Sequence, residues 1–306
     1  MRALLRNRHV LLFVALIAGA VVVLVANQRP LGDAIGALVI LGVLLPLVAM
    51  LATARMPRPA PAAPWRSGDA TLIVGLLAWI VLFLLAKGPL LAALLPSDPD
   101  PRLLETVNTL LKLFAFVLAP WLVLRQRGLS WASGGRSTAS RSQLVVAFVL
   151  MALAALAVQA LLGSQFKRLL TGDFAGSEIA LGGVLCFAWM SVEAGVVEEY
   201  FFRWFLQSRL AAWAGSEVSG IFLSALLFGL AHAPGILLRG AGVEEGLGAV
   251  PGVASTLAYV VVTQGVAGLS FGVLWARTRS FVLVVLLHGF FDALSNTASF
   301  IETWWR

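Results

Sequence analysis

The sequence predicts an all-α protein, a polytopic bundle of about eight or nine transmembrane helices. Its 306 residues are 60% hydrophobic and only 12% charged, and the mean hydropathy is +0.93. Soluble domains are about half apolar and a quarter charged, so this chain has too little polar surface to coat a globule in water. Several apolar runs also reach the roughly 20 residues that a helix needs to cross a bilayer.

Nine apolar runs predict nine spans, with proline clusters at 57–61 and 96–101 between them. A Ser/Gly/Arg-rich loop at 133–142 divides the chain into two predicted regions: a variable N-terminal region, 1–142, with about four spans, and a core, 143–306. The first run is longer than a signal-peptide core and no small-x-small cleavage site follows it, so we interpret it as an uncleaved span. The predicted spans are residues 10–26, 33–54, 70–86, 106–124, 143–163, 180–203, 219–238, 253–276 and 280–300.

The basic residues predict how the chain is oriented. The net charge is +7, and the Lys and Arg residues fall mostly in short loops between the apolar runs. With a cytoplasmic N-terminus, 14 of them lie inside and 7 outside, which is the bias that membrane insertion selects. We therefore expect a multi-pass protein of a bacterial-type inner membrane, with the lipid bilayer as one of its partners. No basic stripe interleaves with aromatic residues, so a nucleic-acid partner is not expected.

Ionisable side chains are concentrated in the last four spans. Each such group inside a span costs roughly 2.5–3.5 kcal/mol on insertion scales, so its presence calls for a functional reason. Two of the three histidines fall in this region. The ionisable residues within or bordering these spans are Glu193, Glu198, Glu199, Arg203, His232, His288 and Asp292.

The spacing of the two adjacent glutamates suggests different roles for them. Glu199 and Arg203 are four residues apart with the acid first, the favourable order for an ion pair on a helix. Glu198 points about 100° away on an α-helix and is left without that partner, free to act as a general base. The alternative is a pair of interfacial charges at a helix end, with Arg203 extending toward the water.

The histidines also admit two interpretations. His288 and Asp292 are four residues apart, so they project from one helix face and can meet a common ligand. The alternative is a local pair that stabilises a polar kink. His232 alone on an apolar helix is more often a hydrogen-bonded packing residue. Three helices that each deliver such groups are much less expected by chance, and this favours a catalytic site.

Three short motifs resemble the CAAX-protease and bacteriocin-processing family of intramembrane proteases, which includes the Ras-converting enzyme. The segment from Glu198 to Arg203 matches the EExxxR signature, and Phe228 to His232 resembles FxxxH. His288 to Asp292 resembles the Hxxx(N/D) motif. The resemblance covers roughly residues 180–296, with the motifs in the family's order and spacing.

The resemblance implies an intramembrane endopeptidase that hydrolyses peptide bonds of membrane-associated proteins. Glu198 with His232 would activate the attacking water, while His288 and Asp292 would bind or polarise the oxyanion. Glu199 with Arg203 would hold the geometry of the site. Asp292 stands where many relatives have Asn, and an ionised Asp cannot donate to an oxyanion, so it must be protonated, orient His288 or bind a metal. Substrates of relatives are prenylated tails, leader peptides or C-terminal sorting tails.

Other functions remain open at this stage. Zinc prefers histidine and carboxylate ligands, so a zinc-dependent peptidase would use Glu198, His232, His288 and Asp292. No HExxH motif is present, and we favour metal-independent chemistry without a cofactor. A non-proteolytic membrane scaffold or immunity protein is the second alternative, although such a protein would be expected to lose a polar member of the motifs. A proton-relay transporter is the third, and the repeat symmetry of many transporters is not evident.

Overall fold

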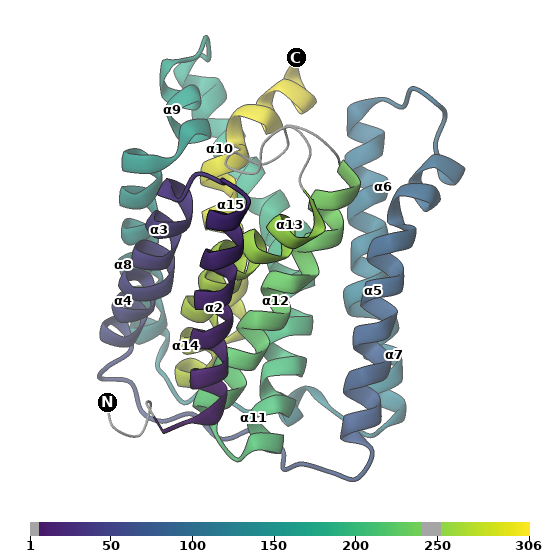
Figure 1. Cartoon of the computed structure of the whole chain (residues 1–306). Helices are drawn as coiled ribbons and strands as arrows, with labels where there is room; N and C mark the ends of the chain where they lie inside the picture. Colours follow the sequence, from purple (N-terminus) through teal and green to yellow (C-terminus); the bar gives the residue numbers. More distant parts are fainter. Residues whose placement is uncertain (1–5, 240–251) are drawn as a thin grey trace.

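The computed structural model describes residues 6–239 and 252–306, and over these it is a bundle of roughly parallel and antiparallel helices (Figure 1). Within these two ranges nine helices are long and apolar enough to cross a membrane, which confirms the predicted fold class. The first span begins and the last span ends at opposite ends of the bundle (Figure 1), as an odd number of spans requires. Arg2 and the side chain of Arg239, which enter the charge comparison, lie outside the described part.

The first four spans agree with the predicted ones to within two residues except at two ends, and one of these is the start of the fourth span at Pro101 rather than near residue 106. The third continues to Leu94 rather than stopping near residue 86, and it contains Pro89. The apolar run resumes after the Lys87-Gly88-Pro89 break, so burial in lipid outweighs the local helix-breaking residues. These spans are α2 (Arg8–Ala26); α3 (Gly32–Val39), η1 (Ile40–Leu44) and α4 (Leu45–Ala52); α5 (Asp69–Leu94); and α6 (Pro101–Leu113), η2 (Phe114–Leu118) and α7 (Ala119–Gln126).

The remaining five spans follow a short 3-10 turn, η3 (Trp131–Gly134). The sixth span runs from Gly176 to Ala214, well beyond the predicted end at residue 203. A short helix, α9 (Ser164–Thr171), precedes it. The five spans are α8 (Arg141–Leu162); α10 (Gly176–Met190), η4 (Ser191–Val196), η5 (Glu199–Gln207) and α11 (Ser208–Ala214); α12 (Glu217–Arg239); α13 (Val253–Val260), η6 (Val261–Gly265) and α14 (Val266–Thr278); and α15 (Phe281–Trp305).

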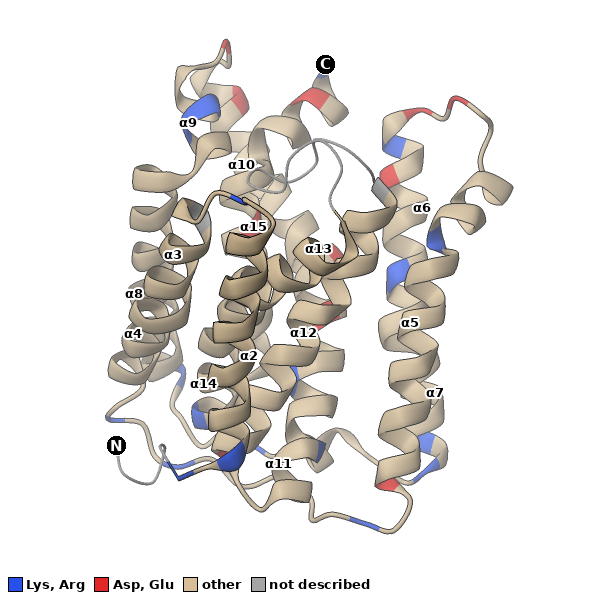
Figure 2. Cartoon of the chain, in the orientation of Figure 1, with Lys and Arg blue, Asp and Glu red and all other residues tan. Residues whose placement is uncertain are grey.

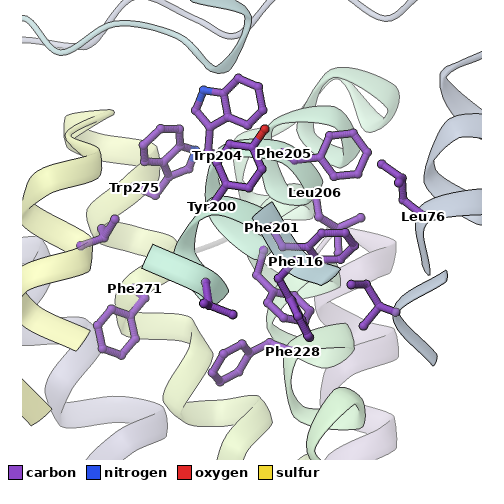
Figure 3. Packing of buried hydrophobic residues seen from close by; sticks show 14 of the residues in the cluster. Leu76, Phe116, Tyr200, Phe201, Trp204, Phe205, Leu206, Phe228, Phe271 and Trp275 are labelled. Carbon is purple, nitrogen blue, oxygen red and sulfur yellow. The ribbon is translucent and has the colours of Figure 1, made fainter. Parts of the chain in front are cut away.

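The eighth span forms the centre of the bundle. In its most apolar window 72% of residues are buried, whereas the other described spans reach at most 50%. Around η5 the largest buried cluster is built from aromatic side chains, and Figure 3 shows Tyr200, Trp204 and Trp275 grouped above Phe116, Phe228 and Phe271. The polar groups of the last four spans therefore lie beside a rigid aromatic core rather than against lipid.

Charged residues are distributed unevenly between the two ends of the bundle. Figure 2 shows Lys and Arg concentrated at the end where the N-terminus lies, while acidic loop residues lie mainly at the opposite end. At the N-terminal end Arg209 holds the loop before α5 to the start of that helix: it pairs with Asp69 at 3.3 Å and donates to the Pro64 carbonyl at 3.1 Å. This end of the bundle therefore has buried arginines that hold the chain together, in addition to the exposed ones.

Candidate active site

Four of the sequence-predicted site residues line one cavity of about 370 Å³. They are Glu198 on the sixth span, His232 on α12, and His288 and Asp292 on α15. Both His288 (8% side-chain exposure) and Glu198 (16%) are largely buried, whereas Asp292 is 35% exposed. Groups from three different spans are thus presented to a common space large enough for water and a short stretch of peptide.

His288 is held in place through one of its ring nitrogens. Its Nδ1 lies 2.8 Å from Oε1 of Glu199, and because a carboxylate accepts, the ring donates this hydrogen bond. Its Nε2 lies 3.6 Å from Oε2 of Glu198 and 3.6 Å from Oδ2 of Asp292. These two separations exceed a hydrogen bond, so Nε2 remains available to a ligand in the cavity. The ring of Phe271 stacks on His288 at 4.9 Å between centroids.

Behind His288, Glu199 and Arg203 form an ion pair with no solvent exposure. Nε of Arg203 lies 3.2 Å from Oε2 of Glu199, so the ion pair predicted from their spacing is present. The guanidinium carbon of Arg203 sits 4.8 Å from the centre of the Phe228 ring, a cation–π contact (Figure 3 shows Phe228). The alternative interpretation, with Arg203 reaching toward water at a helix end, is wrong because the helix continues to Ala214 and buries it.

His232 takes its orientation from its own helix. Its Nδ1 lies 2.8 Å from the carbonyl oxygen of Phe228, one turn earlier, and a carbonyl accepts, so Nδ1 carries the proton. In a ring protonated at Nδ1 alone, Nε2 is an acceptor. The Phe228 ring packs on the imidazole at 4.8 Å between centroids. The same phenylalanine therefore contacts both His232 and Arg203.

Glycines next to each motif allow the site helices to touch. A Cβ at Gly195 would lie 2.6 Å from the Val285 carbonyl oxygen, and one at Gly229 would lie 2.6 Å from the backbone nitrogen of Gly265. A Cβ at Gly289 would lie 2.6 Å from the backbone nitrogen of Ser191. Real side chains do not fit at such separations. Backbone-to-backbone contact therefore sets how closely the sixth span and α12 approach their neighbours.

Uncharged polar residues also line the cavity, and the sequence reasoning missed them. Gln159 on α8 donates from Nε2 to Oγ of Ser295 at 2.8 Å, and both residues line the cavity together with Gln264 of η6. The signal in the sequence is an amide within an apolar run, which the cost of burying ionisable groups does not identify.

A second ion pair lies near the site on its other side. Lys112 in the fourth span lies 2.6 Å from Oε1 of Glu193, with side-chain exposures of 17% and 13%. The pair is within electrostatic range of Glu198 and Asp292. Lys112 therefore neutralises one of the several carboxylates gathered in this part of the bundle.

The arrangement bears on the zinc alternative. Among the residues that the structure describes, no three side chains of His, Cys, Asp or Glu are grouped closely enough to hold a metal ion. The Nδ1 atoms of His232 and His288 are both engaged by protein acceptors, as the second ring nitrogen of a metal-bound histidine usually is, so Nε2 of each ring remains open. A zinc-dependent peptidase with Glu198, His232, His288 and Asp292 as ligands therefore stays an alternative.

Comparison with known proteins agrees with the motifs. Residues 180–294 match the family model described as type II CAAX prenyl endopeptidase, Rce1-like. Searches of curated proteins and of solved structures give no match. The matched segment contains all four cavity-lining site residues and the Glu199–Arg203 pair. Over residues 180–294 the chain is therefore similar to the Rce1-like type II CAAX prenyl endopeptidases.

Proposed function

We propose that this protein is an intramembrane endopeptidase of the glutamate type, which cleaves membrane-associated protein substrates with water activated by Glu198 and His232. The observation that carries this proposal is the shared cavity: four ionisable groups from three spans line one space inside a membrane protein. Groups that cost several kcal/mol to place in lipid converge where a peptide bond and a water molecule can meet. The family of residues 180–294 supports protease chemistry of this kind.

In the proposed mechanism Glu198 is the general base. The carboxylate takes a proton from water while the Nε2 lone pair of His232 orients that water by accepting its second hydrogen. The oxygen attacks the carbonyl carbon of the scissile bond and forms a tetrahedral intermediate. Glu198 then returns the proton to the leaving nitrogen, the carbon–nitrogen bond breaks, and an amine and a carboxylic acid are released.

His288 supplies the oxyanion stabilisation in this scheme. Its Nε2–H, in the imidazolium form, donates to the oxygen that becomes negative, an electrostatic contribution typical of such holes. Glu199 holds the ring by accepting from Nδ1, and Arg203 in turn holds Glu199. Asp292, 3.6 Å from Nε2, is assigned an orienting role, because an ionised carboxylate has no proton to donate.

We also infer the orientation and the class of substrate. The concentration of Lys and Arg at the N-terminal end of the bundle (Figure 2) favours a cytoplasmic N-terminus in an inner membrane of bacterial type. The substrate is a membrane-bound polypeptide: a prenylated tail, a leader peptide or a C-terminal sorting tail. Each of these presents an extended segment beside the bilayer, where it can enter the cavity.

Comparative proteomics of membranes tests the proposal directly. Cells that express the wild-type protein are compared with cells that express Glu198→Ala at equal abundance, and peptide termini are mapped. We expect new termini that depend on Glu198, located in membrane-bound proteins. Identical termini in both strains, with the protein present and folded, would instead favour a non-proteolytic scaffold.

A further inference from the structure

A second cavity, larger than the candidate active site, lies on the other side of the same helices. Its volume is about 740 Å³, against about 370 Å³ for the active-site cavity. Leu41 and Ser270 line the active-site cavity, while their chain neighbours Gly42 and Leu269 line the second one. The second span and α14 therefore form a common wall between the two. We call the second cavity the outer groove.

The outer groove is apolar along its length. Its sides include Pro46, Phe222 and Val273, and Met50, which is 49% exposed, marks where it opens to the outer surface. The eleven residue steps from Gly42 to Thr53 correspond to about 16 Å at 1.5 Å per residue. One leaflet of the hydrocarbon core is about 15 Å thick, half of the total. In a bilayer the groove is filled by acyl chain, because water would find few polar partners there and an empty space loses dispersion contacts.

Cationic side chains gather at one end of this groove, where the spans end. Three arginines and one acid line it there: Arg58, Arg277, Arg279 and Glu217. Arg279 is committed to Glu217 and to Oγ of Ser208. This pairing cancels one of the three positive charges, so the end of the groove keeps two.

The other two arginines retain donors for a ligand. Arg277 donates from Nε and Nη2 to Thr53, at 2.6 and 3.0 Å, and in the described part of the chain its Nη1 has no hydrogen-bond partner. Arg58 is exposed in the loop after the second span, and its guanidinium likewise has no partner among the described residues. Guanidinium groups match the geometry of phosphate oxygens and are less tightly hydrated than ammonium groups.

We propose that the outer groove is a binding site for one anionic phospholipid. An acyl chain lies along the groove between the second span and α14, and the phosphate is bound by Arg58 and Arg277. The apolar length explains why a lipid rather than free phosphate is the ligand. The uncancelled charge explains why an anionic headgroup is preferred over a zwitterionic one. This site is independent of the proteolytic function proposed above.

Lipid titration of the purified full-length protein in detergent tests the site. Dioleoylphosphatidylglycerol, dioleoylphosphatidylcholine and inorganic phosphate are added separately, and bound lipid is counted by native mass spectrometry while the Tm is followed. We expect one tightly held phosphatidylglycerol per chain and a rise in Tm. Phosphatidylcholine should bind more weakly, and inorganic phosphate should have no effect at the same concentration. Equal binding of the two lipids would overturn the proposal, because it would indicate bulk solvation of the surface.

Two variants and their matched controls locate the site. Arg58→Gln should weaken phosphatidylglycerol binding about five-fold, the effect of one basic residue on an anionic lipid, whereas Arg127→Gln, exposed at the same end but outside the groove, should not. Met50→Trp should fill the groove and abolish the tightly held lipid, whereas Leu51→Trp, on the lipid-facing surface, should not. All four substituted side chains are exposed, so we expect each variant to fold. Loss of lipid in a control, or displacement of the lipid by a prenylated peptide, would contradict the assignment.

Discussion

The eighth span and the second span are both apolar enough to cross a membrane, with mean hydropathies of 1.7 and 2.7, but they have different surroundings. Their most apolar windows are 72% and 22% buried inside the protein, respectively. The second span presents side chains such as Val43 and Leu47 to lipid, with exposures of 60% and 48%. In the eighth span, Gln264 and Ser270 face the candidate active site. Polar groups are retained where protein, rather than lipid, surrounds the helix.

The difference in burial between these two spans predicts where a substitution changes stability or activity. A side chain in the central region is surrounded by fixed partners, so a change of charge or volume leaves a group unpaired or a contact too short. A peripheral side chain faces mobile acyl chains, which adjust to a new shape. Matched substitutions in the central and peripheral regions therefore test whether this difference in surroundings is real.

The largest expected effect is on catalysis. Glu198→Gln keeps the shape of the side chain but removes the proposed base, so turnover should fall about 10²- to 10⁴-fold while the Tm stays close to that of the wild type. Cleavage of an identified substrate by purified protein is the measurement. Glu178→Gln, at the exposed end of α10, should retain activity. Near-normal turnover by Glu198→Gln would exclude the general-base role.

The next effect is on stability. Glu199→Gln should lower the free energy of unfolding by about 3–5 kcal/mol, because Arg203 is left unpaired in a place without solvent and His288 loses the carboxylate that holds it. The exposed Glu302–Arg168 pair provides the control, and Glu302→Gln should change the Tm little. Tm values in one detergent measure both. Equal, small shifts would show that the buried pair contributes no more than a surface pair.

Glycine substitutions should have opposite signs in the two regions. Gly229→Ala places a Cβ against the Gly265 backbone and should destabilise the protein by about 1–3 kcal/mol, as overpacking does. Gly75 in α5 has no atom within 4 Å of an added Cβ, so Gly75→Ala should be neutral or stabilising by up to about 1 kcal/mol. The Tm of each variant is the measurement. Stabilisation by Gly229→Ala would mean that α12 and η6 do not pack as closely as described.

The smallest expected effect is that of metal removal. If Glu198 and His232 activate water without a metal, exhaustive chelation should leave turnover unchanged, and the active protein should contain far less than one zinc per chain. Metal analysis and activity are measured on the same detergent-purified sample. One zinc per chain, lost together with activity on chelation and restored with it, would replace the glutamate mechanism with a metal-dependent one.

The spans and the motifs could be predicted because each depends on local sequence. Membrane thickness sets the length of an apolar run, and the i, i+4 spacing places Glu199 beside Arg203. The hydrogen bond from His288 to Glu199 could not be predicted, because it joins residues 89 positions apart and depends on how two helices pack. The contact of Gln159 with Ser295 is non-local in the same way. The division of the chain at residue 142 stays a prediction.

The sixth span differs from its prediction for a physical reason as well. Tyr200, Phe201 and Phe202 were expected near the end of the helix, but the aromatic cluster buries them almost completely. Packing of these rings against other spans extends the helix past Arg203, which hydropathy alone marks as a boundary. A charged residue within a span is a reliable end signal only where it faces lipid or water.

The wide turns of η5 determine how the sixth span responds to a change in chain length. Each π-helical hydrogen bond closes over one residue more than in the α-helix around it, so Glu199–Gln207 behaves as an insertion absorbed within the helix. Deleting a single residue there would remove the wide turn and leave the helix beyond it in register, whereas the same deletion in the regular α10 would rotate one part of the span against the other by about 100°. The deletion in η5 would therefore keep Gln207 near the Gly272 carbonyl, to which it donates at 2.8 Å. In evolution the wide turns of this segment should accept the loss of one residue more readily than the regular helix before it.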